Sequence, residues 1–191
     1  IQVSNLDFHG NLVFTPHATF LDPYQPIPHY SCNYDCSFAR DWEDREYDFS
    51  FIGSFVTHPV RRRLFDFFSS KERCLIVDTG GWHYENSKDT QIRNSFNYAK
   101  ILGNTKYSLC PRGTGPSTIR IWEAMAMKSH PVILSDFLKM PGGVEHEGDL
   151  WSRMPENFND LVNFSERKEY NNKVYGETFS NDNLYKSILR L

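Results

Sequence analysis

The sequence contains no apolar run approaching the about 18 residues that a membrane-spanning helix needs. It has no basic segment followed by an apolar stretch at its start, so no signal peptide is visible. Basic residues are not in excess either, because the formal net charge is −3. We therefore expect no membrane segment in this chain and no nucleic-acid partner.

Three nucleotide and metal motifs are also missing. There is no Gly-Lys-Ser/Thr of a Walker loop, no GxGxxG and no Asp-x-Asp. These absences count against phosphatase-like P-loop enzymes and NAD enzymes, and we expect neither a metal site nor a cofactor. The chain begins with Ile rather than Met, so its compartment stays open: the cytoplasm, or the Golgi lumen if an N-terminal anchor was removed.

Cysteine is scarce, with four residues in 191. Cys32 and Cys36 are close enough in sequence to form a disulfide, or half of a metal site, but no second pair with ligand spacing follows. Cys74 and Cys110 border apolar runs, which favours packing as small hydrophobic residues. Free thiols are the expected state of the core cysteines, and whether Cys32 and Cys36 pair stays open.

What the sequence does contain is an alternation of short apolar runs and amphipathic segments. Hydrophobic residues make up 39% of the chain, which fits a folded domain. The pattern predicts strands at 12–15, 48–52, 73–77, 107–110 and 131–134, and helices at 60–69, 91–102 and 116–128. Such an order predicts an α/β fold, a Rossmann-like parallel sheet with flanking helices and right-handed crossovers.

The segments outside this core are less regular. Residues 17–29 hold three prolines and predict a loop, and 32–46 show no clear period. Short helices are expected at 158–164 and 183–191. We divide the chain into an N-terminal segment at 1–47, a Rossmann-like domain at 48–141 and a tail at 142–191 that packs back.

Ligands of parallel α/β sheets bind beyond the carboxyl ends of the strands. Four segments follow predicted strand ends here: Gly53-Ser54, Asp78-Thr79, Pro111–Ser117 and Ser135-Asp136. We expect them to line one crevice.

The segment 111–123 carries groups suited to a nucleoside diphosphate. Gly113 and Gly115 allow a close approach of the backbone, and the predicted helix start at Pro116 offers unpaired N–H groups to an anion. Further candidate donors are Arg112, Ser117, Thr118 and Arg120. Glu123 is a candidate acceptor for ribose hydroxyls. The alternative interpretation is an ordinary turn with a surface ion pair between Arg120 and Glu123, which would stabilise the fold little.

Three consecutive arginines, 61 to 63, stand in the first turn of the helix predicted at 60–69. Positive charge at a helix start is unfavourable. Either an anion binds there or neighbouring carboxylates offset the charge, and the residues alone favour neither.

Several of these motifs together resemble the exostosin family of glycosyltransferases (family 47). The resemblance rests on YSLCPRG at 107–113, Ser117, Arg120, Glu123-Ala124 and PVIL at 131–134, and upstream on LVFTP at 12–16, FIGSF at 51–55 and His58-Pro59 with Arg61 and Leu64. It covers about residues 10–140. The chain departs from the family pattern at Ser129-His130, where a glycine and a small residue are usual.

The resemblance implies the C-terminal, nucleotide-sugar-binding half of a two-domain (GT-B) transferase. It implies an inverting transfer from a UDP-sugar donor to an oligosaccharide or glycoprotein acceptor, without an essential metal. It also assigns Gly53, Ser54 and Arg61 to the donor site together with the residues of 111–123. The donor sugar and the acceptor stay open.

An inverting transfer needs a base for the acceptor hydroxyl. The candidates are Asp22, His17, Asp78 and Asp136, because each lies in a loop near a predicted strand end. The alternative function is a catalytically inactive module of the same fold that binds a nucleotide or a glycan. Its aromatic side chains, among them Trp42, Trp82, Trp122 and Trp151, would suit stacking on sugars.

Overall fold

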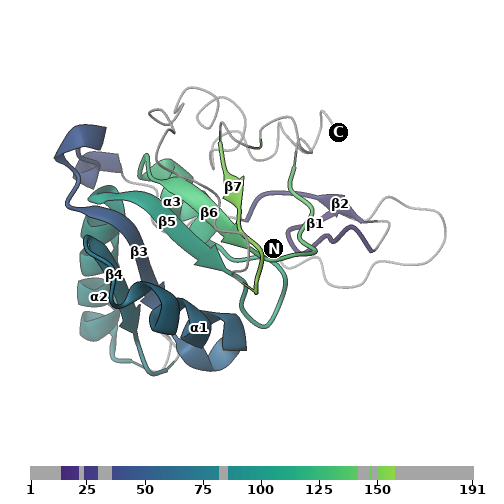
Figure 1. The fold of residues 1–191 in the computed structure, drawn as a ribbon, viewed down its shortest axis with the longest axis horizontal. Helices are drawn as coiled ribbons and strands as arrows, with labels where there is room; N and C mark the ends of the chain where they lie inside the picture. Colours follow the sequence, from purple (N-terminus) through teal and green to yellow (C-terminus); the bar gives the residue numbers. More distant parts are fainter. Residues whose placement is uncertain are drawn as a thin grey trace.

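A computed structural model describes residues 14–21, 24–29, 36–81, 86–141, 147 and 150–157. Five parallel strands form the central sheet in the order β4-β3-β5-β6-β7 (Figure 1). Their bounds are β3 Tyr47–Gly53, β4 Cys74–Asp78, β5 Thr105–Pro111, β6 His130–Leu134 and β7 Ser152–Arg153. The predicted α/β class with a Rossmann-like parallel sheet is confirmed.

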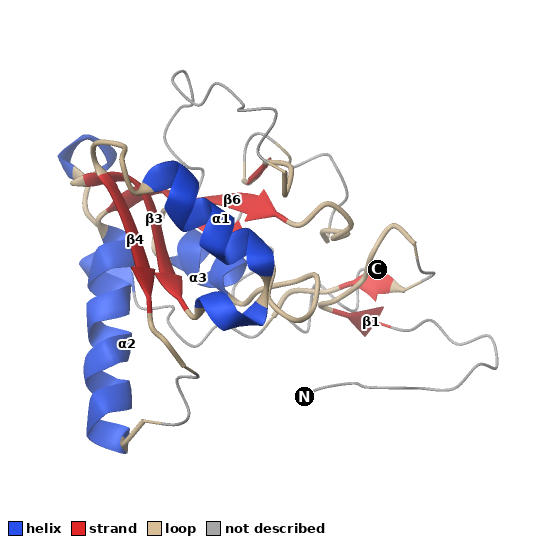
Figure 2. Cartoon of the chain, turned by 60° about the horizontal axis from the view of Figure 1, so that its bottom comes forward, coloured by secondary structure: helices blue, strands red, loops and turns tan. Residues whose placement is uncertain are grey.

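Helices cover both faces of this sheet (Figure 2). On one face, Val60, Leu64 and Phe68 of α1 (Pro59–Phe68) pack on alternate residues of β3, β5 and β6. On the other face lie α2 (Lys88–Gly103) and α3 (Arg120–Ala126), which pack around Cys110 and Ile133. Because β5 and β6 are covered on both sides, they read as continuous apolar runs, as buried parallel strands do.

Local signals explain where the two longer helices begin. The His58 side chain accepts a hydrogen bond from the Val60 N–H, and Pro59 occupies the first position of α1. Ser87 accepts a hydrogen bond from the Thr90 N–H at the start of α2. Gly103 ends α2 as predicted, but the glycine is required there by contact: a Cβ would lie 2.4 Å from the Phe38 carbonyl oxygen.

The third helix is shorter than predicted. It begins at Arg120 rather than at Pro116, with Ile119 as a cap that makes no side-chain hydrogen bond. Residues 112–119 are therefore a loop, and the expected helix start at Pro116 is wrong. Helix α3 has only seven residues, so its terminus alone does not make an anion site. An anion would have to be bound by the side chains of this loop and of Arg120.

Two strands differ from expectation. The predicted strand at 73–77 was expected to be buried, but β4 is the edge of the sheet and Val77 is 37% exposed. Strand β7 was not predicted and comes from the segment beyond Pro141, where it pairs with β6 at Val132 and Ser152. The domain limits 1–47, 48–141 and 142–191 stay a prediction.

A small two-stranded parallel sheet precedes the main one. Strand β1 (Phe14–Thr15) agrees with the strand expected at 12–15, and β2 (Gln25–Pro26) lies in the segment predicted to be a loop. The segment is tied to the chain beyond β6, because the Phe20 N–H donates to the Phe137 carbonyl (3.0 Å) and the Lys139 N–H to that of Ala18 (2.9 Å). Two 3-10 turns, η1 (Cys36–Phe38) and η2 (Trp42–Asp44), occupy the stretch expected to be irregular.

Other expectations concern single residues. Cys74 and Cys110 are free thiols, and Cys110 is fully buried in the core as expected. Cys32 and the helices expected at 158–164 and 183–191 lie outside the described residues. None of the helices in the described ranges is long and apolar enough to span a membrane.

Candidate functional site

The strand order places a reversal between β3 and β5. The chain runs from β3 outward to β4, then crosses back to β5 on the other side of β3 and continues to β6. Helix α1 consequently lies on one face of the sheet, and α2 and α3 on the other. In doubly wound folds, the crevice beyond the carboxyl ends at such a reversal is the usual ligand site. Gly53, Ser54 and Arg112 stand at this point.

Arg61 joins the two loops that leave β3 and β5. It reaches from the first turn of α1 and is only 8% exposed. Its Nη1 donates to the Ser54 carbonyl (2.9 Å) and its Nε to the Arg112 carbonyl (3.0 Å). The side chain therefore fixes the spacing of the two loops, and no further hydrogen bond engages its Nη2 among the described residues.

The three neighbouring arginines of α1 have three different surroundings. Arg62 is exposed and faces Asp66 at 3.7 Å, and Arg63 donates to the Glu156 carbonyl (3.1 Å). Arg61 has no carboxylate partner within the described ranges. Of the two alternatives for this helix start, compensation by a neighbouring carboxylate therefore applies to Arg62 and not to Arg61.

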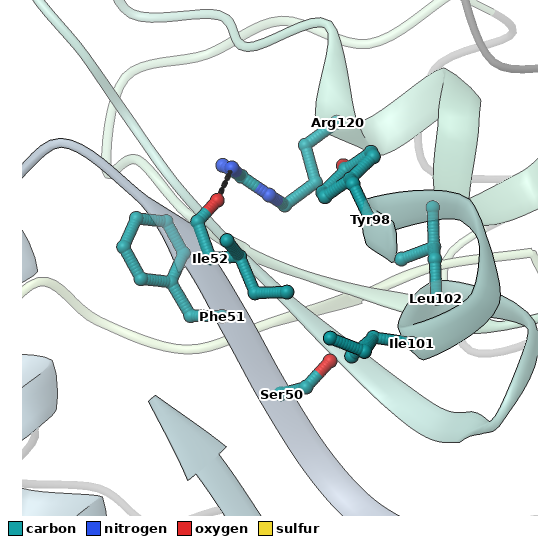
Figure 3. A pocket seen from close by; sticks show the side chains of 7 residues that line it. All are labelled: Ser50, Phe51, Ile52, Tyr98, Ile101, Leu102 and Arg120. Carbon is teal, nitrogen blue, oxygen red and sulfur yellow. Dashed lines mark hydrogen bonds between the residues drawn. The ribbon is translucent and has the colours of Figure 1, made fainter. Parts of the chain in front are cut away.

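Arg120 approaches the same point from the other face of the sheet. It is the first residue of α3 and is also 8% exposed. Its Nη2 donates to the Ile52 carbonyl at the end of β3, and its guanidinium lies 4.4 Å from the centre of the Phe51 ring (Figure 3). Its Nε is buried and has no hydrogen-bond partner among the described residues.

The two guanidinium groups form a buried pair of like charge. Arg61 also lies over Phe51, at 5.4 Å from the ring centre. Burial, and then the charge of Arg120, lowers the pKa of Arg61 to about 10. Within the described ranges, no carboxylate forms an ion pair within 4 Å of either guanidinium. An anion at this point would stabilise both.

Arg112 differs from them because it has a carboxylate nearby. Its Nη1 lies 3.8 Å from Oε1 of Glu156, and its Nε is buried without a hydrogen-bond partner in the described ranges. Glu156 and Asp136 bind each other reciprocally, since each N–H donates to the other's carboxylate (3.0 and 3.2 Å). Sequence reasoning missed Glu156, which follows the unpredicted strand β7; its only sequence signal is that it is acidic in an acidic tail.

Three glycines of this edge touch functional side chains. A Cβ on Gly53 would lie 2.9 Å from Nη2 of Arg120, and one on Gly113 would lie 3.1 Å from Nη2 of Arg61. A Cβ on Gly115 would lie 2.8 Å from Nδ1 of His17. The first and third contacts are too close for a side chain, and the second is tight. A side chain at one of these positions would therefore displace the arginine terminus or the His17 ring that packs on the loop.

The hydroxyl and carboxylate candidates are more deeply buried than a surface turn would be. Ser117 is 6%, Thr118 is 9% and Glu123 is 4% exposed. Burial and the Glu123 carboxylate raise the pKa of Tyr98 on α2 well above its usual value, so Glu123 lies near that hydroxyl. This geometry is not that of a surface ion pair between Arg120 and Glu123.

Several buried polar atoms of this edge lack a hydrogen-bond partner among the described residues. They are Ser54 Oγ, Arg112 Nε, Arg120 Nε and Ser135 Oγ. Buried polar groups are normally paired, because an unpaired one costs about 1–3 kcal/mol. Three of the four belong to donor-site candidates, and the fourth, Ser135, lies in a segment expected to line the crevice.

The four base candidates are distributed as follows. His17 contacts Gly115, and its ring centre lies 5.1 Å from that of His29. Asp78 and Asp136 are exposed at the ends of β4 and β6. Asp22 lies outside the described residues.

A small hollow beside Arg120 lies between β3 and α2 and is lined among others by Ser50, Ile52 and Tyr98 (Figure 3). It has no room for a water molecule, whereas ligand pockets usually have about 300–1,000 Å³. We therefore assign no ligand to it. Within the described ranges, no three His, Cys, Asp or Glu side chains are grouped as metal ligands would be.

Residues 29–149 match the family of the RXYLT1 C-terminal domain. The chain belongs to this family. The matched region is well over half of the chain and contains β3 to β6 with all three arginines of the site. The RXYLT1 C-terminal domain is a glycosyltransferase-like domain of the exostosin-like kind, so the expected membership among glycosyltransferases is confirmed at this coarser level.

Proposed function

We propose that this chain binds the nucleotide-sugar donor of an inverting glycosyltransferase. The donor is a UDP-sugar and the acceptor a glycan or a glycoprotein. The chain acts as the C-terminal half of a GT-B type enzyme. What supports the proposal is the buried pair Arg61 and Arg120 at the reversal of strand order, in a chain of a glycosyltransferase family.

The chemistry follows from where charge develops. As the bond between the sugar and the diphosphate breaks, negative charge grows on the departing oxygens, and fixed cations stabilise it. Arg61 and Arg120 are held by main-chain carbonyls before any ligand arrives, so they need no reorganisation. Arg112 can turn its free donor toward the same phosphates. With three arginines, the reaction requires no metal.

The remaining candidates complete the donor site. Gly53 and Gly113 keep the backbone close to the two guanidinium groups, which leaves the phosphates room above the loops. Ser54, Ser117 and Thr118 offer hydroxyls, of which Ser54 Oγ is buried and has no hydrogen-bond partner among the described residues. Glu123 accepts hydrogen bonds from the ribose.

Calorimetric titration with UDP, GDP and ADP in EDTA tests this proposal. We expect binding of UDP in preference to the other two. UDP-xylose is the first donor to assay next, because the matched family is named for a xylosyltransferase; UDP-galactose and UDP-glucuronate complete the panel. Failure to bind any nucleotide would contradict the proposal, and a strict need for a divalent metal would contradict its mechanism.

A catalytically inactive module of the same fold would bind UDP but release none from any donor. Stacking of sugars on tryptophan has little support here, since Trp122 is 2% and Trp151 is 0% exposed in the core. Trp42 packs edge-on against Tyr107, and Trp82 lies outside the described residues.

A further inference from the structure

Two histidines of the N-terminal segment lie against the loop that follows β5. His17 and His29 meet edge to face, with ring centres 5.1 Å apart and an angle of 80° between the ring planes. His17 also contacts the backbone of this loop, because a Cβ on Gly115 would lie 2.8 Å from its Nδ1 and 2.9 Å from its Cε1. The contact holds one edge of the ring on the loop.

The same loop touches Arg61 two residues earlier. Gly113 would place a Cβ 3.1 Å from Nη2 of Arg61. Two residues of extended chain span at most about 7 Å, and each Cα–Cβ bond adds about 1.5 Å, so the His17 ring and the Arg61 guanidinium are no more than about 16 Å apart. His17 and Arg61 therefore pack on the same short loop beyond β5.

The surroundings keep His17 in a form that can accept a proton. Burial lowers the pKa of His17 below its usual value, which favours the neutral imidazole. Burial, and then His17, lowers the pKa of His29 to about 4, which makes His29 neutral as well. A neutral His29 adds no charge that would repel a proton arriving on its neighbour.

The two exposed carboxylates among the candidates are engaged in loop structure. Oδ1 of Asp78 accepts hydrogen bonds from the N–H groups of Phe55 (3.1 Å) and Gly80 (3.0 Å). Oδ1 of Asp136 accepts one from Glu156 (3.0 Å). Within the described ranges, the His17 ring donates and accepts no hydrogen bond. Because its Nδ1 lies against Gly115, Nε2 is the nitrogen that can accept a proton from a substrate.

We propose that His17 is the catalytic base for the acceptor hydroxyl, and that His29 is a positioning residue that holds its ring. The assignment rests on the proposed function. In the step, the imidazole takes the hydroxyl proton while the hydroxyl oxygen forms its bond to the anomeric carbon. The bond from that carbon to the diphosphate breaks, and UDP leaves with the electron pair. The imidazolium then releases its proton to solvent.

The decisive variant is His17→Gln, assayed for UDP release from the donor of the panel that the parent protein uses best. Water serves as the acceptor when no glycan is supplied. We expect kcat to fall at least about 100-fold, the usual contribution of a general base, while the affinity for UDP changes less than twofold. Asp78→Asn and Asp136→Asn are the matched rivals, and each should retain most of kcat.

His29 has its own test. His29→Ala should lower kcat about tenfold without a change in UDP affinity, and His29→Phe, which keeps a ring at the contact, should restore most of it. Loss of UDP affinity in both variants would show a structural role and overturn the positioning assignment.

The outcomes separate this inference from the proposed function. A parent protein that binds no nucleotide contradicts the proposed function and the base together. A parent that binds UDP but releases none from any donor is the inactive module, and that outcome overturns the base together with the transferase activity. A His17→Gln variant as fast as the parent overturns the base alone. Loss of kcat in Asp78→Asn or Asp136→Asn, with His17→Gln unaffected, would assign the base to that carboxylate.

Discussion

At the amino ends of the strands, Arg45 is 2% exposed and all three of its guanidinium nitrogens donate to main-chain carbonyls. The acceptors are Arg40 (3.1 Å), Thr105 (2.6 Å) and Met127 (3.3 Å). At the carboxyl ends, Arg61 and Arg120 are nearly as buried, yet together they make three such bonds and face each other's charge. Every guanidinium nitrogen of Arg45 is thus hydrogen-bonded to the protein itself. The arginines at the carboxyl ends keep donors that could bind a ligand.

A buried arginine alone does not mark a ligand site. Burial of the charge is common to both sites and so cannot by itself indicate a ligand. What distinguishes the carboxyl ends is the combination of a second cation and of donors such as Arg120 Nε that have no hydrogen-bond partner among the described residues. An arginine with a structural role donates its hydrogen bonds to groups of the protein itself.

The largest effect is expected from Arg45→Met. The substitution removes three charged hydrogen bonds, two of them to the buried carbonyls of Thr105 and Met127, and each such loss costs about 1–3 kcal/mol. We expect the free energy of unfolding to fall by about 3 kcal/mol, measured by chemical denaturation. The UDP affinity of the folded protein should not change.

Arg40→Met is the control for this variant, because Arg40 lies on the same segment with an exposed side chain. It should alter the free energy of unfolding by no more than about 0.5 kcal/mol. An Arg45 variant as stable as the parent would contradict the structural role of Arg45.

The next effect concerns the carboxyl-end pair. Arg61→Ala and Arg120→Ala should each weaken UDP binding at least about tenfold, the scale of a lost charged hydrogen bond to phosphate. Stability should fall less than in Arg45→Met, since each variant also removes the repulsion between two buried cations. Calorimetric titration of UDP and chemical denaturation of the same samples give both quantities.

Arg62→Ala is the matched control, one residue along α1 with an exposed side chain opposite Asp66. It should leave UDP affinity unchanged. Equal UDP affinity in the Arg120 variant and the parent would show that Arg120 does not bind the diphosphate. Arg120 would then have a structural role, as Arg45 has.

The sequence predicted the sheet and the edge at which this comparison arises. Strands β5 and β6 were predicted from short apolar runs and β3 from the alternation of residues 48–52. Parallel strands bring Gly53-Ser54 and Pro111-Arg112 to one edge. The family resemblance singled out Arg61, but charge pattern alone could not separate it from Arg62 and Arg63. That separation depends on which way each side chain leaves the helix and on Glu156, which lies far along the chain.

Three other features could not be predicted from the sequence. Strand β7 has two residues, too few for a pattern, and forms only because β6 offers it a free edge. The start of α3 moved from Pro116 to Arg120 because residues 112–119 are shaped by tertiary contacts, such as that of Gly115 with His17, which no local propensity encodes. The structural role of Arg45 could not be predicted either, because its acceptors at Thr105 and Met127 become neighbours only in the folded sheet.

The smallest effect concerns Glu123 and distinguishes residues that bind the phosphates from residues that bind the ribose. Glu123 is 4% exposed and one turn along α3 from Arg120. If its carboxylate accepts from ribose hydroxyls, Glu123→Gln should weaken UDP about fivefold, or about 1 kcal/mol, because an amide oxygen is a poorer acceptor than a carboxylate. Inorganic diphosphate, which lacks the ribose, should bind as to the parent.

Tyr98→Phe serves as the control, because the Glu123 carboxylate also acts on the Tyr98 hydroxyl. Removing that hydroxyl keeps the ring in place and should leave both affinities unchanged. Equal losses of UDP and diphosphate in Glu123→Gln would mean that the carboxylate acts through the arginines rather than on the ribose. If Tyr98→Phe reproduced those losses, Glu123 would instead belong with Arg45, as a buried charge that serves the fold.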